Sequence, residues 1–196
     1  MTQDRRTNRI LVTLLLAGFL LAASFTALAK EKYERIEAVA LGESTQLGRH
    51  ASITIIIYEF STADDQKNLF EAFKADGPKG LHNAVSKLQS HGRIAISGTL
   101  GFDIKYIREF KQPDGSRKLR MVTDRPIRFG EAWSDSRSSD YNLSAFEIIL
   151  SPEKGKSTGT LLPVMQLKVN DKTGEIELEA FQNPWKLTNI SDYLPD

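Results

Sequence analysis

Residues 52–60 read SITIIIYEF, and this run of β-branched and aromatic residues decides the fold class. Apolar residues occupy both alternating sets of positions, for example Ile55 in one set and Ile56 in the other. A strand that is apolar on both faces is covered on both faces, so the run predicts a central strand of a sheet.

Residues 61–89 interrupt the strand pattern and predict two helices. The Ser-Thr pair at 61–62 can cap the first helix, and acidic residues follow in its first turn. The sequence Asp-Gly-Pro at 76–78 ends this helix, and proline suits the first turn of the next. We therefore expect a helical hairpin that lies on a sheet. The second helix carries its apolar side chains on one stripe: Leu81, Ala84, Val85 and Leu88.

The rest of the sequence predicts antiparallel strands joined by hairpins, with turn sequences PDGS at 113–116 and DKTG at 171–174. A long polar loop is expected at 130–142, and the tail after Trp185 is expected to lie on the surface. The fold class is α+β, a curved antiparallel sheet or open barrel of about eight strands with an inserted helical hairpin. A complete lipocalin-like barrel is the alternative. The expected strands are 33–41, 52–60, 93–97, 102–111, 117–123, 145–150, 161–169 and 175–181.

The first 29 residues predict a secretory signal peptide that is cleaved after Ala29. Three arginines precede residues 10–29, which carry no charge and end in the small-x-small sequence Ala-Leu-Ala. The alternative is an uncleaved N-terminal anchor, since about 20 apolar residues span a bilayer. Either interpretation exports residues 30–196 as a single α+β domain in an extracytoplasmic location, periplasmic or secreted. Membrane attachment is expected only if the N-terminal segment is not cleaved.

Composition excludes several classes of function. The chain has 196 residues, with 26 Lys and Arg against 25 Asp and Glu, and it has no cysteine. The near balance of charge gives no electrostatic reason to expect a nucleic-acid partner. The absence of cysteine excludes disulfides, thiolate catalysis and cysteine-ligated metals.

The three histidines, His50, His82 and His91, follow no metal-ligand spacing, so neither a metal site nor a cofactor is expected. A Ser–His–Asp arrangement is spatial rather than sequential, and the fold would have to assemble it. This leaves an extracytoplasmic hydrolase with a dispersed site as an alternative function.

Residues 105–128 hold eight basic residues against three acidic ones. The simpler interpretation is that neighbouring strands pair these charges across a solvated face. The other interpretation is a basic patch for an anionic ligand. For that second case Arg108, Arg125 and Arg128 are the candidate ligand contacts, because a guanidinium binds two oxygens of a carboxylate or phosphate at once.

Four segments together resemble a group of uncharacterised exported bacterial proteins, and the resemblance covers most of residues 50–190. It implies an extracytoplasmic bacterial location, and it carries no activity, cofactor or catalytic residue. The segments are Tyr58 to Thr62, Gly92-Arg93-Ile94, Thr123 to Ile127, and Gly174 to Glu179.

The leading hypothesis from the residues is an exported, non-catalytic binding or interaction module. Its expected partner is a small apolar or anionic ligand, or an envelope protein, held by a curved sheet. The alternatives are the hydrolase named above and an envelope-anchored accessory protein.

Overall fold

The computed structural model describes residues 33–127, 143–170, 172–173, 176–180 and 184–195. The expected signal peptide, the expected loop at 130–142 and Arg128 lie outside these residues. Within the described part, no helix is both long enough and apolar enough to cross a bilayer.

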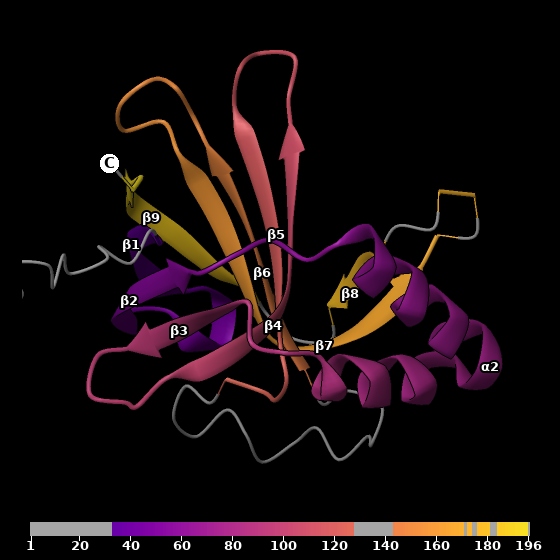
Figure 1. Cartoon of the computed structure of the whole chain (residues 1–196). Coiled ribbons are helices and arrows are strands. Elements are labelled where there is room, and N and C mark those ends of the chain that lie inside the picture. The colour runs from indigo at the N-terminus through magenta and orange to yellow at the C-terminus, as the bar shows by residue number, and fades with distance from the viewer. Residues whose placement is uncertain (1–32, 128–142, 171, 174–175, 181–183, 196) are drawn as a thin grey trace, which may run out of the picture. The chain divides into compact units, whose positions relative to one another are not determined.

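The described strands form one antiparallel sheet in the order β6-β5-β4-β3-β2-β1-β9-β7-β8, and β6 also pairs with β7 (Figure 1). That extra pairing joins β6, the first strand of this order, to β7, so β1 to β7 and β9 close into a barrel. Strand β8, at the other end of this order, pairs among the described strands only with the second half of β7 and extends the sheet beyond the barrel. The bounds are β1 (Glu34–Gly42), β2 (His50–Ile57), β3 (Gly92–Ile96), β4 (Phe102–Lys111), β5 (Arg117–Thr123), β6 (Leu143–Leu150), β7 (Thr158–Val169), β8 (Ile176–Ala180) and β9 (Trp185–Tyr193).

The barrel is closed rather than open because the C-terminal tail is a strand. Strand β9 pairs with β1 on one side and with β7 on the other, so the expectation of a surface tail was wrong. The register of β1 and β9 shifts between Glu37 and Val39, and Asn189 has a positive φ of 51°. This irregularity interrupts the alternation that predicts a strand.

Apolar side chains fill the barrel interior. In β2 the inward residues Ile53, Ile55 and Ile57 are buried, whereas the outward Ile56 is only half-buried. The expectation that both faces of this strand are fully covered was therefore wrong for the outer face. The interior cluster also includes Ile36, Ile94, Ile104, Ile107, Leu119, Met121, Ile127, Phe146, Ile148, Leu150, Leu161, Trp185 and Leu187.

The inserted helix α2 (Ala63–Lys87) begins as the sequence predicts. The Thr62 hydroxyl accepts from the Asp65 backbone N–H at 3.1 Å, and the Asp65 carboxylate accepts from the Thr62 N–H at 2.7 Å. Within α2, Asp76 and Gly77 have non-helical φ and ψ, so two helical segments meet at a sharp break where the sequence predicts that the first helix ends. Gly77 has a φ of 56°, which is why the break needs a glycine.

Helix α2 covers the outer face of the barrel beside β7 (Figure 1). Its buried residues Leu69, Leu81 and Val85 pack against outward side chains of the strands. The helix thus gives this side of the sheet a second apolar core, as a helix packed on a sheet requires. The strand residues in this core are Tyr106, Val122, Leu143, Ala145, Met165 and Val169.

Candidate functional site

A shallow groove lies where the β3–β4 turn meets the segment that follows β5. Its volume is about 420 Å³, within the range of clefts that hold small ligands. Within the described residues this groove is the candidate ligand site, while the barrel interior there is lined by a cluster of buried apolar side chains. It is lined by Thr99, Leu100, Gly101, Phe102, Arg125 and Pro126.

Arg125 is the charged group of the groove. Its guanidinium carbon lies 5.4 Å from the centre of the Phe102 ring, within the range of a cation–π contact. Its Nε is 4.0 Å from the Asp124 carboxylate, and the side chain is 61% exposed. The ring therefore supports one face of the guanidinium while much of its donor edge faces solvent, where it can bind a carboxylate or phosphate.

Two buried hydroxyl groups hold the backbone beneath Arg125. The Thr123 hydroxyl donates to the Arg125 carbonyl oxygen at 2.7 Å and accepts from the Ser144 N–H at 3.1 Å. The Ser144 hydroxyl accepts from the Ile127 N–H at 2.6 Å. Ile127 belongs to the interior core, so the segment that carries Arg125 is anchored on both sides of this residue.

Glycine shapes the opposite wall of the groove at position 101. Gly101 has a φ of +85°, and a Cβ added there would lie 2.6 Å from the Ile94 carbonyl oxygen. The turn can therefore pack tightly against β3 only with glycine at this position. Thr99 closes the turn, since its hydroxyl donates to the Ile96 carbonyl oxygen at 2.9 Å and accepts from the Gly101 N–H at 3.2 Å.

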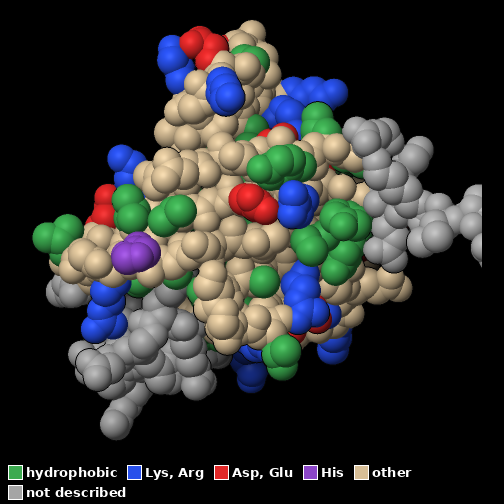
Figure 2. Space-filling model, turned by 90° about the vertical axis from the view of Figure 1, so that its left-hand side faces the viewer, with side chains coloured by type: hydrophobic (Ala, Val, Ile, Leu, Met, Phe, Trp, Pro, Cys, Tyr) green, Lys and Arg blue, Asp and Glu red, His purple; other side chains and the backbone are tan. Residues whose placement is uncertain are grey.

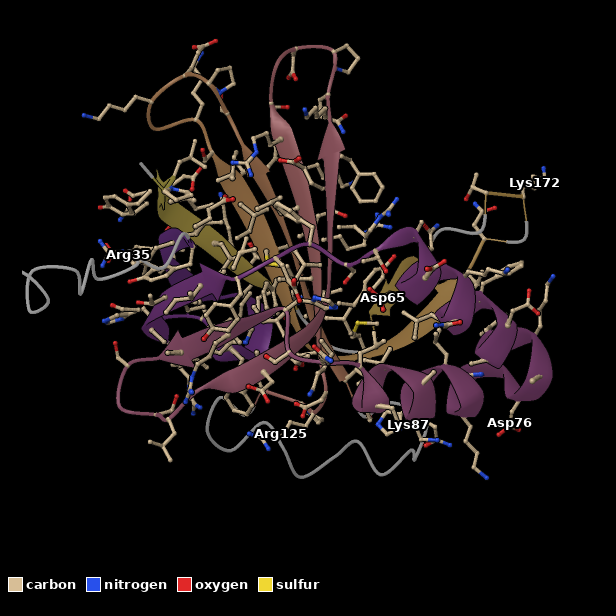
Figure 3. The ribbon with its side chains drawn as sticks, in the orientation of Figure 1. Arg35, Asp65, Asp76, Lys87, Arg125 and Lys172 are labelled. Atoms are coloured by element: carbon tan, nitrogen blue, oxygen red, sulfur yellow. The ribbon has the colours of Figure 1, made fainter. Side chains whose placement is uncertain are left out.

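Of the three arginines predicted as ligand contacts, the two that the structure describes, Arg108 and Arg125, lie apart. Arg125 lies in the groove, at the lower edge of Figure 3, well away from Arg35. Arg108 lies six residues further along β4 than Phe102, a separation of roughly 20 Å. Arg128 lies outside the described residues. The structure thus places only Arg125 in the groove.

Arg108 faces outward because of an irregularity in β4. The register of β4 and β5 shifts between Ile104 and Tyr106, so Ile104 points into the barrel whereas Tyr106 and Arg108 point outward. A strict alternation along β4 would place all three on one face. Arg108 instead lies opposite Arg120 and 6.0 Å from the Phe110 ring.

Most of the other basic residues in this run pair with acids on neighbouring strands, as the simpler interpretation predicts. Arg120 lies 3.0 Å from the Glu147 carboxylate on β6, and Lys118 lies 2.7 Å from the same carboxylate. These pairs belong to a solvated strand face.

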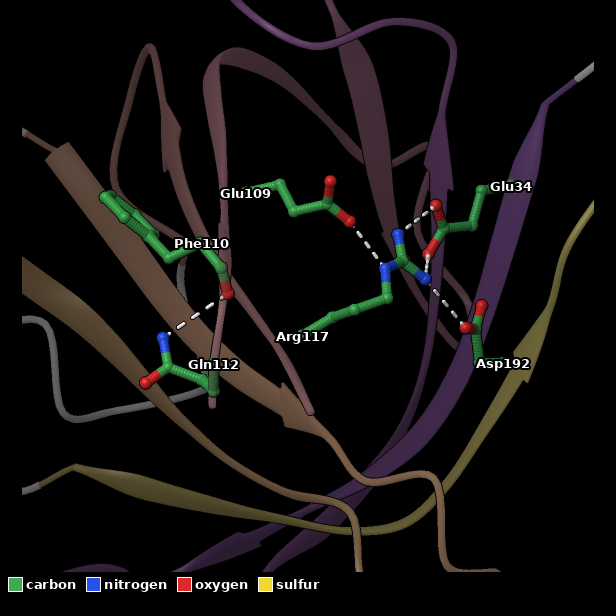
Figure 4. A network of polar contacts seen from close by, with 6 residues as sticks. All are labelled: Glu34, Glu109, Phe110, Gln112, Arg117 and Asp192. Carbon is green, nitrogen blue, oxygen red and sulfur yellow. Dashed lines mark hydrogen bonds and ion pairs between the residues drawn. The ribbon is translucent and has the colours of Figure 1, made fainter. Parts of the chain in front are cut away.

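A polar cluster centred on Arg117 lies at the end of the barrel opposite the groove, at the mouth formed by β1, β4, β5 and β9 (Figure 4). Arg117 donates to both oxygens of Glu34, at 2.9 and 3.1 Å. It also contacts Glu109 at 2.5 Å and Asp192 at 3.1 Å. Strand β5 is not adjacent to β1 or β9 in the sheet, so Arg117 reaches across the mouth.

One arginine and three carboxylates leave excess negative charge at the mouth. Burial, followed by the nearby Glu34 carboxylate, raises the pKa of Asp192 to about 6, although Arg117 acts in the opposite direction. Burial alone would lower the pKa of Arg117, but its hydrogen bonds to Glu34 and Glu109 raise it overall. We interpret this cluster as structural: it links strands across the mouth of the barrel, and its acid Asp192 is easily protonated.

His91 is the buried histidine among the described residues, and it lies between two acids. Its Nδ1 is 3.2 Å from the Glu59 carboxylate and its Nε2 is 3.6 Å from the Asp65 carboxylate, but neither contact has hydrogen-bond geometry. The nearby Ser61 hydroxyl accepts from the Ile107 N–H at 3.0 Å. Among the described residues no serine hydroxyl forms a hydrogen bond with His91, so His91 and a described serine do not make a nucleophile–base pair.

Across the described residues, no three side chains of the metal-ligating types converge on one point. Comparison with protein families, with curated proteins and with solved structures finds no match to this chain. The resemblance to exported bacterial proteins therefore stays a prediction, and the function has to be argued from the groove.

Proposed function

We propose that the chain is an exported, non-catalytic binding module, and that its site is the groove lined by Leu100, Phe102 and Arg125. The observation that carries this proposal is the guanidinium of Arg125 lying over the Phe102 ring at the edge of an apolar groove. A ligand with an apolar body and a carboxylate or phosphate head fits both parts of the groove.

The rigidity of the site supports binding. The Thr123 and Ser144 hydroxyls fix the backbone on one wall, and the Gly101 turn fixes the other. A site whose walls are already ordered loses little conformational entropy when the ligand binds. The hydrolase alternative has weaker support, because the buried His91 contacts two carboxylates and forms no hydrogen bond with a serine among the described residues.

The first test is the mass of the protein recovered from an exporting host, measured under native and then denaturing conditions. A retained ligand appears as extra mass that is lost on denaturation. The denatured mass also gives the N-terminus: a start at Lys30 supports export with cleavage, whereas an intact N-terminus favours the anchored accessory protein.

The second test uses dodecyl phosphate, an anion with an apolar tail, as the probe. We expect Arg125→Gln to weaken its binding by about tenfold, the effect of losing one charge-assisted contact. Arg35→Gln is the matched control, because Arg35 also lies over an aromatic ring, 4.6 Å from the centre of Tyr193 at the other end of the barrel. Absence of binding, or equal losses in both variants, would overturn the proposal.

A further inference from the structure

Two leucines stand out on the surface at the loop end of the barrel. Leu100 is 89% exposed and Leu47 is 82% exposed, more than any other large apolar side chain of the described residues. Leu100 lies in the β3–β4 turn, and Leu47 lies in the β1–β2 loop beside the short helix η2 (Ser44–Gln46). An exposed leucine alone is common, but two such residues on neighbouring loops form a feature that calls for a partner.

The sheet places these two loops side by side. Strands β2 and β3 are antiparallel neighbours, and the Ser97 N–H donates to the Ser52 carbonyl oxygen at 3.0 Å at the end of this pair. The loop before β2 and the turn after β3 therefore emerge from the same end of the barrel. The C-terminal Leu194 follows β9 at the opposite end, where Arg35 pairs with Tyr193.

Both loops are ordered by their own hydrogen bonds. In the β1–β2 loop the Gly42 N–H donates to the Arg49 carbonyl oxygen at 2.9 Å, and Ser44 adopts a positive φ of 55°. In the β3–β4 turn Thr99 binds the backbone on both sides of itself. Hydrogen bonds thus fix the backbone of the two loops that carry the exposed leucines.

The charges around the two leucines favour an anionic surface. Within the described residues Arg49 and Arg93 form no ion pair, and the ion pair of Arg125 with Asp124 is long, at 4.0 Å. Among the described residues at this end basic side chains outnumber acidic ones, and two of the acids, Asp103 and Asp124, contact Lys105 and Arg125. The basic residues are Arg49, Arg93, Lys105, Arg125 and Lys186, and the acidic residues are Glu43, Asp103 and Asp124.

We propose that this end of the barrel docks on an anionic phospholipid bilayer, with Leu47 and Leu100 inserted at the interface and the arginines on the phosphates. Exposed apolar side chains with basic side chains around them bind an anionic membrane through two effects, burial of apolar surface and electrostatic attraction to the phosphates. A broad protein interface is less well supported, because Figure 2 shows hydrophobic side chains in small separate groups with charged ones between them. This docking does not require the groove to hold a soluble ligand.

The test is cosedimentation of the exported protein with vesicles of phosphatidylcholine containing 30% phosphatidylglycerol. We expect binding that falls with rising salt and that is weak on pure phosphatidylcholine. Leu47→Ser and Leu100→Ser each lower the partition coefficient by about tenfold, as expected for partial burial of one leucine side chain. Leu194→Ser, at the opposite end and 61% exposed, is the matched control and leaves binding unchanged.

A local readout separates loop docking from any contribution of the N-terminal segment. Leu47→Trp and Leu100→Trp should each give tryptophan fluorescence that brominated lipids quench, whereas Leu194→Trp should not. Because Leu47 does not line the groove, Leu47→Ser should also leave dodecyl phosphate binding intact. No vesicle binding, equal binding by all three serine variants, or equal quenching of all three tryptophans would overturn the docking proposal without touching the groove.

Discussion

Replacing Asp192 by asparagine tests the electrostatics of the barrel mouth. The pKa of Asp192 is raised from 3.8 to about 6 by burial and by the neighbouring Glu34 carboxylate. The native state therefore binds more protons than the unfolded chain between these two values. The free energy of unfolding falls as the pH rises through this window, and the penalty is fully present above pH 6. At neutral pH the charge of Asp192 destabilises the fold.

The size of the effect follows from the same values. A difference of about two pKa units corresponds to at most about 3 kcal/mol. The side chain is partly exposed, so solvent screening reduces the expected gain from Asp192→Asn to about 1 kcal/mol at pH 7.5. The asparagine side-chain oxygen can still accept the hydrogen bond that Arg117 donates, without the excess negative charge.

Urea unfolding at pH 5.0, 6.0 and 7.5 measures this prediction directly. The unmodified protein should become more stable as the pH falls from 7.5 to 5.0, and Asp192→Asn should lose most of that slope. Asp103→Asn is the control, because Asp103 lies outside the mouth cluster and its side chain is 49% exposed. Lower stability of Asp192→Asn at pH 7.5, or an unchanged slope, would refute the account of the mouth.

Three further substitutions test other parts of the structure, each by urea unfolding or thermal melting. Arg117→Met should cost about 3 kcal/mol, because it leaves the buried Glu34 carboxylate without its main partner; a loss below about 1 kcal/mol would contradict this. Thr123→Val should cost about 1 to 2 kcal/mol, because a buried carbonyl and a buried amide lose their partner, and its failure to destabilise would exclude a positioning role. Gly101→Ala should cost about 1 to 2 kcal/mol, since alanine is strained at positive φ and its Cβ meets the Ile94 carbonyl; an unchanged melting temperature would show that the turn adapts freely.

Local patterns predicted the strands well where the alternation was regular. The PDGS turn at 113–116 and the patterns on its two sides predicted β4 and β5 with the bounds that the structure shows. The capping hydroxyl of Thr62 predicted the start of α2. Closure of the barrel could not be predicted in the same way. It depends on β9, whose alternation is broken at Asn189, and on the pairing of β6 with β7.

Of the predicted ligand contacts, Arg125 lines the candidate groove, next to Pro126 and after the end of β5. The outward face of Arg108 could not be predicted from alternation, because the irregularity near Ile104 reverses it. The cross-barrel role of Arg117 was not predicted, since Glu34 lies 83 residues away in sequence and no local pattern links them.

The groove itself is tested most directly by an NMR titration of the ¹⁵N-labelled exported protein with dodecyl phosphate below its micelle concentration. The account predicts saturable shifts of the backbone amides at Thr99–Phe102 and Arg125, and no comparable shifts at the barrel mouth around Arg117. Shifts centred on interior residues such as Phe146, or no saturable shifts at all, would contradict the assignment of the ligand site to this groove.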